Sequence, residues 1–219
     1  MVKFFFILFT FSTFIFSEEG FLVSSNIIDI SRHDSNVKFN LKKGLEKIIG
    51  QRLAPKSSFS FNKIVGDASL VNGYLPARVY DGDEVALEAG GGICILASSI
   101  FNSLLLAGFS IEERHKHSRP VSYIESGLDA TILYGRRDLK MKNLSTETFW
   151  ITGELSNSKL ILKVYSNSEP KKSFSLRVQV QKNSTKANES ASGKTVKVYR
   201  ESENELELLY SDFILPVSN

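Results

Sequence analysis

The chain has 219 residues, 42% of which are hydrophobic, and this is enough to build one or two domains with a real core. The formal net charge is only +3 and no dense basic block appears, which argues against a nucleic acid as partner. Beyond the first residues, no run is apolar and long enough to span a membrane.

Residues 1–17 have the pattern of a secretory signal peptide. Lys3 supplies a positive charge, residues 4–16 are mostly apolar, and the small residue Ser17 precedes two glutamates. As a helix, residues 4–16 would reach about 20 Å, which is short of the roughly 30 Å hydrocarbon core of a bilayer. A cleaved signal is therefore favoured over an uncleaved anchor. We expect an exported protein of the periplasm or cell envelope, which contacts the membrane only if this segment is retained.

The next part of the chain combines a helix with short strands. Residues 18–35 are mixed in polarity, and we expect a loosely ordered segment there. Apolar residues recur at helical spacing over 37–49, and Gly50 follows where a helix cap belongs. Serine and phenylalanine alternate over 58–61, which predicts a strand, and residues 77–80 predict another.

The strongest helical pattern covers residues 94–107, directly after three consecutive glycines. Few of its positions are polar, so we expect a largely buried helix that ends at Gly108. Apolar and polar residues then alternate, and a strand that continues through 111–117 would place His115 and His117 on one face.

The remainder of the chain is rich in predicted strands, and an exposed polar loop interrupts them. The strands are expected at 121–124, 130–134, 148–155, 160–165, 173–181, 196–199 and 206–216, and the loop at 182–194. Helices early and strands late indicate an α+β fold. We predict a mostly buried central helix after a Gly-rich turn, packed on an antiparallel sheet, with a strand-rich C-terminal part.

Cys94 is the single cysteine of the chain, and it lies at the predicted start of the central helix. Unpaired backbone N–H groups and the helix dipole favour an anion at that position, including a thiolate. A single cysteine forms no internal disulfide, so it is buried and inert, paired with another molecule, or reactive. His115 and His117 follow about twenty residues later and complete the residue types of a cysteine-nucleophile site.

Several short segments occur in a fixed order over roughly residues 55–165. They include the glycine-rich turn that leads into Cys94 and the stretch that holds both histidines. The segments are 58–66, 72–74, 90–94, 98–102, 105–108, 113–123 and 127–131.

Taken together, these segments resemble the VanW family. The resemblance implies a cell-envelope protein, because the family is named from glycopeptide-resistance clusters and often lies beside peptidoglycan-binding modules; it implies no established activity. It indicates a VanW-like domain at 36–170 and leaves 171–219 as a β-rich C-terminal extension. The family usually has glutamine after the cysteine, whereas this chain has Ile95. If that glutamine donates to a reacting oxyanion, losing it costs about 3–4 kcal/mol of barrier.

The first hypothesis makes the chain a thiol-dependent enzyme that hydrolyses or transfers an amide of peptidoglycan stem peptides, the substrate class implied by the resemblance. Cys94 is the nucleophile, and the backbone N–H groups of residues 92–95 hold the oxyanion. His115 or His117 is the base, and Asp129 orients it. An amidase, a peptidase and a transpeptidase all agree with this chemistry.

The second hypothesis is a non-catalytic module of the cell envelope that binds peptidoglycan or a peptide. The turn of Gly91, Gly92 and Ile93 would hold a carboxylate, and Cys94 would be a packing residue. Further polar contacts would come from Arg114, His117, Arg119 and Tyr123. A structural or assembly role without a ligand is the remaining alternative.

A zinc site is a third arrangement of nearly the same residues. His115 and His117 on one strand face would converge with Cys94, and Glu113 would add an oxygen ligand. The set lacks a signature spacing, so we predict no metal and no other cofactor. The expected partner is peptidoglycan or its stem peptides.

Overall fold

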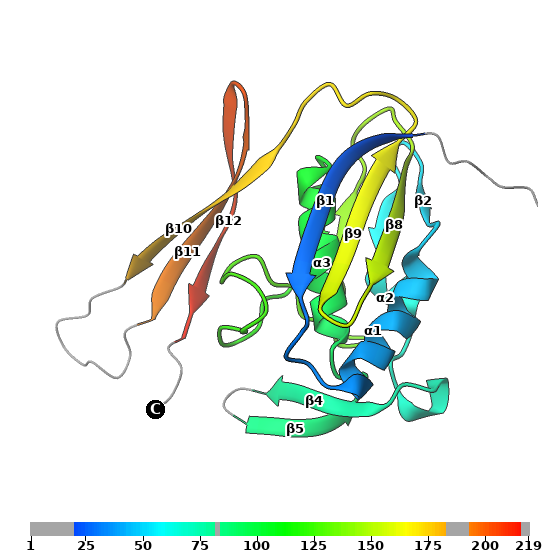
Figure 1. The fold of residues 1–219 in the computed structure, drawn as a ribbon. Helices are drawn as coiled ribbons and strands as arrows, with labels where there is room; N and C mark the ends of the chain where they lie inside the picture. The colour runs from blue at the N-terminus through cyan, green and yellow to red at the C-terminus, as the bar shows by residue number, and fades with distance from the viewer. Residues whose placement is uncertain (1–19, 82–83, 183–192, 216–219) are drawn as a thin grey trace, which may run out of the picture.

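The computed structural model describes residues 20–81, 84–182 and 193–215 (Figure 1). The signal-peptide pattern at 1–17 lies outside these ranges, as do residues 183–192 of the expected loop. None of the helices within the described ranges is long and apolar enough to cross a bilayer.

The main body consists of two long helices packed on a four-stranded antiparallel sheet. The helices are α1 (Ser35–Ile48) and α3 (Ile93–Leu106), and the strands are β1 (Phe21–Asp29), β2 (Arg52–Leu53), β8 (Phe149–Leu155) and β9 (Lys159–Ser166). The strand order is β1-β9-β8-β2. The helices contact each other and cover one face of the sheet (Figure 1). Burial alternates along β9, so its buried residues face the helices.

Smaller elements surround this body, and their strand pairings are also antiparallel. The strands are β3 (Ser58–Ser60), β6 (Ser110–Glu113) and β7 (Lys140–Lys142) in one sheet, β4 (Pro76–Asp81) and β5 (Glu84–Ala89) in a hairpin, and β10 (Ser175–Lys182), β11 (Lys194–Ser202) and β12 (Glu205–Ile214) in another sheet. Short helices occur at α2 (Phe61–Val65) and Leu70–Asn72. The predicted α+β class is confirmed.

The central helix α3 is buried along almost its whole length. Its apolar side chains form the middle of the main core, and its polar side chains are hydrogen-bonded within the protein. Ser98 Oγ accepts from the N–H of Ala130 at 2.9 Å, and Asn102 Nδ2 donates to the carbonyl of Leu128 at 2.7 Å. These bonds hold the 128–130 segment against the helix.

Both predicted helices are confirmed, with bounds shifted by one or two residues. The expectation of a loosely ordered segment at 18–35 is wrong for residues 21–29, which form β1 and pair with β9. That partner lies far along the chain, so local polarity did not reveal the strand.

The strands expected at 121–124 and 130–134 are absent from the described structure, and β6 ends at Glu113. This stretch has another source of order: its backbone is held by side chains of α3 and by Arg114. The residues His115 and His117 therefore do not belong to a strand.

The C-terminal extension forms the three-stranded sheet β10-β11-β12 (Figure 1). It has a small core of its own, made by Val196, Val198 and Ile214. It also reaches the main core, because the half-buried Leu209 and Tyr210 pack against both clusters. The extension is thus joined to the rest of the fold by side-chain packing.

Replacing Leu104 with alanine removes a fully buried side chain from α3. We expect the free energy of unfolding to fall by about 2–5 kcal/mol, because transfer energy is lost and a cavity remains. Urea denaturation followed by circular dichroism measures this change. Leu87→Ala is the control, since that side chain is 72% exposed and its loss should have little effect. Similar losses for both variants would contradict the assignment of the core.

Candidate active site

Cys94 is the second residue of α3, and a glycine turn positions it. Gly92 caps the helix with φ +99°, and a Cβ there would lie 2.8 Å from a methyl group of Val37. The N–H groups of Ile93 and Ile95 donate to the carbonyls of Gly90 and Gly92. The N–H of Cys94 has no acceptor among the described residues and lies at the end of the helix dipole.

His117 and Asp129 form a short hydrogen-bonded pair beside this cysteine. His117 Nδ1 lies 2.7 Å from Asp129 Oδ2, and the backbone N–H of His117 donates to the same oxygen at 2.7 Å. This leaves Nε2 as the nitrogen that can face the thiol of Cys94, which lines the same pocket as the imidazole. The hydroxyl of Thr131 lies 3.6 Å from the sulfur. The three side chains have the order of a nucleophile, a base and an orienting carboxylate.

Charge in this cluster favours a thiolate and an imidazolium. Burial raises the pKa of Cys94, but the hydrogen bond and charge of His117 outweigh it, so the pKa lies below its ordinary value. Burial lowers the pKa of His117, yet the bonds to Asp129 and Cys94 raise it to about 9. Burial likewise raises the pKa of Asp129, while His117 and the Arg114 charge give a net decrease. Asp129 is therefore an anion beside an imidazolium near neutral pH.

His115 has a different environment from that of His117. Its Nε2 lies 3.0 Å from Glu113 Oε1, and its side chain is 39% exposed. Lys140 and the N–H of Asp138 hold the pKa of Glu113 at about 2, so this partner is an anion. His117 is the imidazole beside the thiol. Within the described ranges, no group of three or more His, Cys, Asp or Glu residues is arranged to hold a metal ion.

Arg114 lies behind Asp129, which is a correction to the expected ligand contact. Its Nη2 is 3.1 Å from Asp129 Oδ1, and its Nε donates to the carbonyl of Asp129 at 2.8 Å. Nη1 is 2.5 Å from Asp212 Oδ2 in β12. The arginine side chain is only 5% exposed, and its donors are directed at protein groups, so it supports the site from inside.

The thiol opens into a pocket of about 370 Å³. The candidate ligand-binding residues Gly92, Ile93 and Tyr123 line it, whereas Gly91 and Arg119 are not among its lining residues. A Cβ on Gly91 would lie 2.6 Å from the carbonyl oxygen of Ala77, so this glycine allows close packing with β4. Cys94 itself is only partly exposed.

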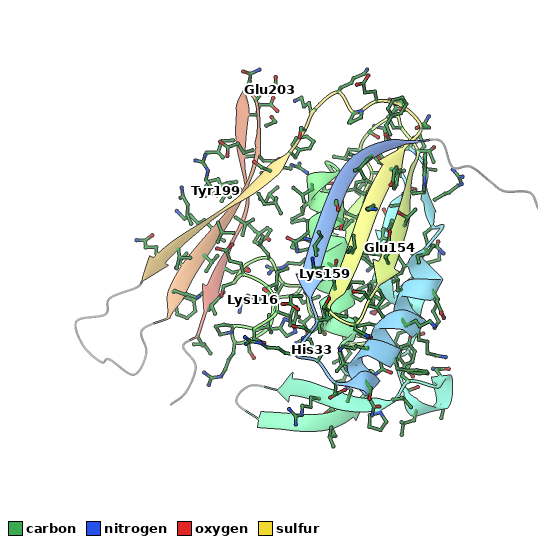
Figure 2. All side chains as sticks on the ribbon, in the orientation of Figure 1. His33, Lys116, Glu154, Lys159, Tyr199 and Glu203 are labelled. Atoms are coloured by element: carbon green, nitrogen blue, oxygen red, sulfur yellow. The ribbon has the colours of Figure 1, made fainter. Side chains whose placement is uncertain are left out.

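Other residues of this pocket were not found from the sequence. His33 lines it together with Arg78 of β4 and Arg137. Figure 2 shows His33 in the connection between β1 and α1. These residues lie far from Cys94 in the chain, and no local pattern connects them. Ser98 and Asn102 were also missed, although two polar residues at i, i+4 within an apolar helix are a signal that they bind a neighbouring segment.

Ile95, at the position where glutamine is usual, is almost fully buried at 3% exposure. Its side chain lines the pocket and has no hydrogen-bond donor. An oxyanion beside the sulfur can therefore accept a hydrogen bond from the backbone N–H of Cys94, but the side chain of residue 95 cannot donate a second one.

Comparison with known proteins gives matches over the same part of the chain. The VanW-like protein family model matches residues 36–165. The uncharacterized protein YoaR of Bacillus subtilis (strain 168) is 31% identical over 128 residues, covering 58% of this chain and 42% of that protein. The vancomycin B-type resistance protein VanW of Enterococcus faecalis (strain ATCC 700802 / V583) is 29% identical over 143 residues, covering 63% of this chain and 52% of that protein. The matches thus span about half of each relative, and no solved structure matches the chain.

In the wild-type protein, we expect iodoacetamide to label Cys94 at a pH below the usual midpoint of a free thiol, about 8.5. His117→Ala should raise that midpoint, because the thiolate loses the hydrogen bond and charge that lower its pKa. Mass spectrometry of the labelled protein across a pH series measures the effect. His115→Ala is the matched control and should leave the midpoint unchanged. A midpoint that shifts in His115→Ala instead, or labelling that occurs only after unfolding, would contradict the pairing of Cys94 with His117.

Proposed function

Because the chain belongs to the VanW-like protein family, we propose that it is a cell-envelope protein whose thiol cleaves or transfers an amide bond of peptidoglycan stem peptides. The observation that carries the proposal is the arrangement of Cys94, His117 and Asp129 at the start of α3. The envelope location rests on the signal-peptide pattern of residues 1–17 and on the family, one member of which is named as a vancomycin resistance protein.

In the first step, the thiolate of Cys94 attacks the carbonyl carbon of the amide and forms a C–S bond. The negative charge moves to the carbonyl oxygen, which accepts a hydrogen bond from the N–H of Cys94 at the helix terminus. His117 then donates its proton to the amide nitrogen, the C–N bond breaks, and the amine leaves. A thioester on Cys94 remains, and Asp129 keeps the imidazole oriented throughout.

In the second step, neutral His117 takes a proton from the incoming nucleophile, which attacks the thioester and releases the thiolate. Water gives hydrolysis, as in an amidase or peptidase. An amine of another peptide gives transfer, as in a transpeptidase. The same residues serve both outcomes, so which one occurs depends on which nucleophile enters the pocket.

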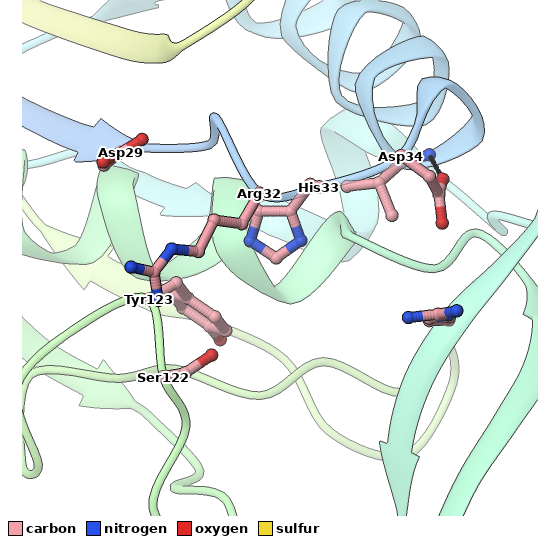
Figure 3. Close-up of a pocket in the computed structure, with 8 residues that line it drawn as sticks. Asp29, Arg32, His33, Asp34, Ser122 and Tyr123 are labelled. Atoms are coloured by element: carbon pink, nitrogen blue, oxygen red, sulfur yellow. Dashed lines mark hydrogen bonds between the residues drawn. The ribbon is translucent and has the colours of Figure 1, made fainter.

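A second hollow extends the pocket and suggests how an acidic peptide is held. It has a volume of about 500 Å³ and shares His33, Arg78 and Tyr123 with the pocket of Cys94. Figure 3 shows Arg32 and Tyr123 reaching into it from different segments. Arg32 and Arg78 are exposed cations here.

The acidic residues of this hollow already bind backbone groups. Asp34 accepts from the N–H of Val37 at the start of α1, and Asp29 accepts from the N–H of Ser31. The two arginines are therefore the charges best placed for a ligand. Stem peptides carry carboxylates, which guanidinium groups recognise with well-defined geometry.

The alternative function is a non-catalytic module that binds the same peptides. The presence of Ile95 favours it, because this side chain supplies no donor to an oxyanion. The two functions use the same pocket and hollow and differ only in what the thiol does, so a substitution of Cys94 separates them.

Cys94→Ala is expected to abolish turnover of muropeptides, because no other group replaces the nucleophile, while peptide affinity stays within a few-fold of wild type. Liquid chromatography with mass spectrometry detects the products, and calorimetry measures binding. Cys94→Ser is the conservative control and should also lose turnover. Binding by the wild-type protein without any turnover would support the non-catalytic module instead.

Arg78→Ala is expected to raise KM for a stem peptide several-fold with kcat little changed, because the guanidinium binds a carboxylate equally before and during reaction. Steady-state kinetics measure this split. For the same peptide with its carboxylates amidated, KM should be the same for the wild-type protein and for Arg78→Ala. Arg177→Ala, on the exposed face of β10, is the matched control. Equal losses with both peptides would contradict the recognition of a carboxylate.

A further inference from the structure

We propose that Asp212 and Tyr210, in the last strand β12, are positioning residues for the Cys94 site and act through Arg114 on Asp129. The family match ends at residue 165, so both lie outside the segment that defines the family. The inference rests on the thiol chemistry proposed above, but its readout is the reactivity of the thiol and needs no substrate.

Arg114 links two carboxylates that lie far apart in the chain. Nη1 contacts Asp212 at 2.5 Å, while Nη2 contacts Asp129 at 3.1 Å and donates to the carbonyl of Gly127 at 3.1 Å. The side chains of Arg114, Asp129 and Asp212 are 5%, 6% and 11% exposed. At such burial, an ion pair that loses one partner leaves an uncompensated charge, which is strongly unfavourable.

Tyr210 fixes the same arginine from a second direction. Its ring centre lies 4.6 Å from the guanidinium carbon, and its hydroxyl donates to the carbonyl of Gly127 at 2.7 Å. Gly127 has φ +96°, and a Cβ there would lie 2.7 Å from a methyl group of Val196 in β11. The turn that leads into Asp129 is thus held between Arg114 and the C-terminal sheet.

The charges along this line alternate in sign. Asp212 faces Arg114, Arg114 faces Asp129, Asp129 faces His117, and His117 faces Cys94. Tyr123 is a further titratable group close to the imidazole, and burial keeps its pKa above the ordinary value, so it stays neutral. Without Asp212, the positive charge of Arg114 would be balanced by Asp129 alone. Asp129 would then stabilise the imidazolium of His117 less.

The test is the titration of the His117 ring, followed by NMR, together with iodoacetamide labelling of Cys94 across pH. Asp212→Asn removes a negative charge, so we expect the titration to move to lower pH by several tenths of a unit and the labelling at neutral pH to slow several-fold. Asp212→Glu retains the charge and should return both towards wild type. Glu201→Gln breaks an exposed ion pair with Arg177 in the same sheet and should change neither.

A folded Asp212→Asn protein with unchanged titration and labelling would overturn the proposal, since a purely structural role lowers stability without moving the His117 titration. If that variant does not fold, Tyr210→Phe gives the second test. It keeps the ring on Arg114 and removes only the bond to Gly127, so labelling at neutral pH should slow, and an unchanged rate would overturn the proposal. A wild-type thiol with an ordinary pKa would instead overturn the chemistry assigned to Cys94.

Discussion

The structure depends on one constraint: α3 is buried along nearly its whole length, so the hydroxyl and amide donors of its polar side chains need acceptors inside the protein. Ser98 and Asn102 satisfy this need by binding the backbone around Ala130, and Ser99 binds Asn26 of β1. Because an unpaired buried group would cost about 1–3 kcal/mol, these bonds fix an otherwise irregular segment on the helix. That segment carries Asp129, so the packing of the core also determines the position of the candidate site.

The candidate site combines two independent ways of stabilising a thiolate. The helix terminus acts through backbone dipoles, which the fold provides without any ionisable side chain. His117 acts through a charge, and this charge exists near neutral pH only because Asp129 and Cys94 raise its pKa to about 9. Asp129 in turn remains ionised while buried because the hydrogen bonds from His117 and the charge of Arg114 lower its pKa. The pKa of one thiol is therefore set by a series of buried charges.

Much of this could be predicted from the sequence where the signal is local. The glycine turn, the helix behind it and the candidate residues Cys94 and His117 could be named from position and residue type, and Asp129 lies in a segment that resembles the VanW family. The choice between His115 and His117 could not, because it depends on β6 ending at Glu113, which takes His115 as a partner. Strand β1 and the two arginines of the second hollow, Arg32 and Arg78, were also missed, since their neighbours come from distant parts of the chain. Tertiary contacts, which local patterns do not encode, decided each of these cases.

The pairing of distant segments has a consequence for how the molecule matures. Strand β1 pairs with β9 through Phe21 and Ser166, and Arg114 meets Asp212 across 98 residues of chain. Contacts of such long sequence separation form late, because a large loop must close before they contribute any stability. During synthesis Cys94 is made well before His117, Asp129 and the strand that carries Asp212. The thiol can therefore meet His117 and Asp129 only after those residues are made, and Arg114 can meet Asp212 only when the last strand has docked.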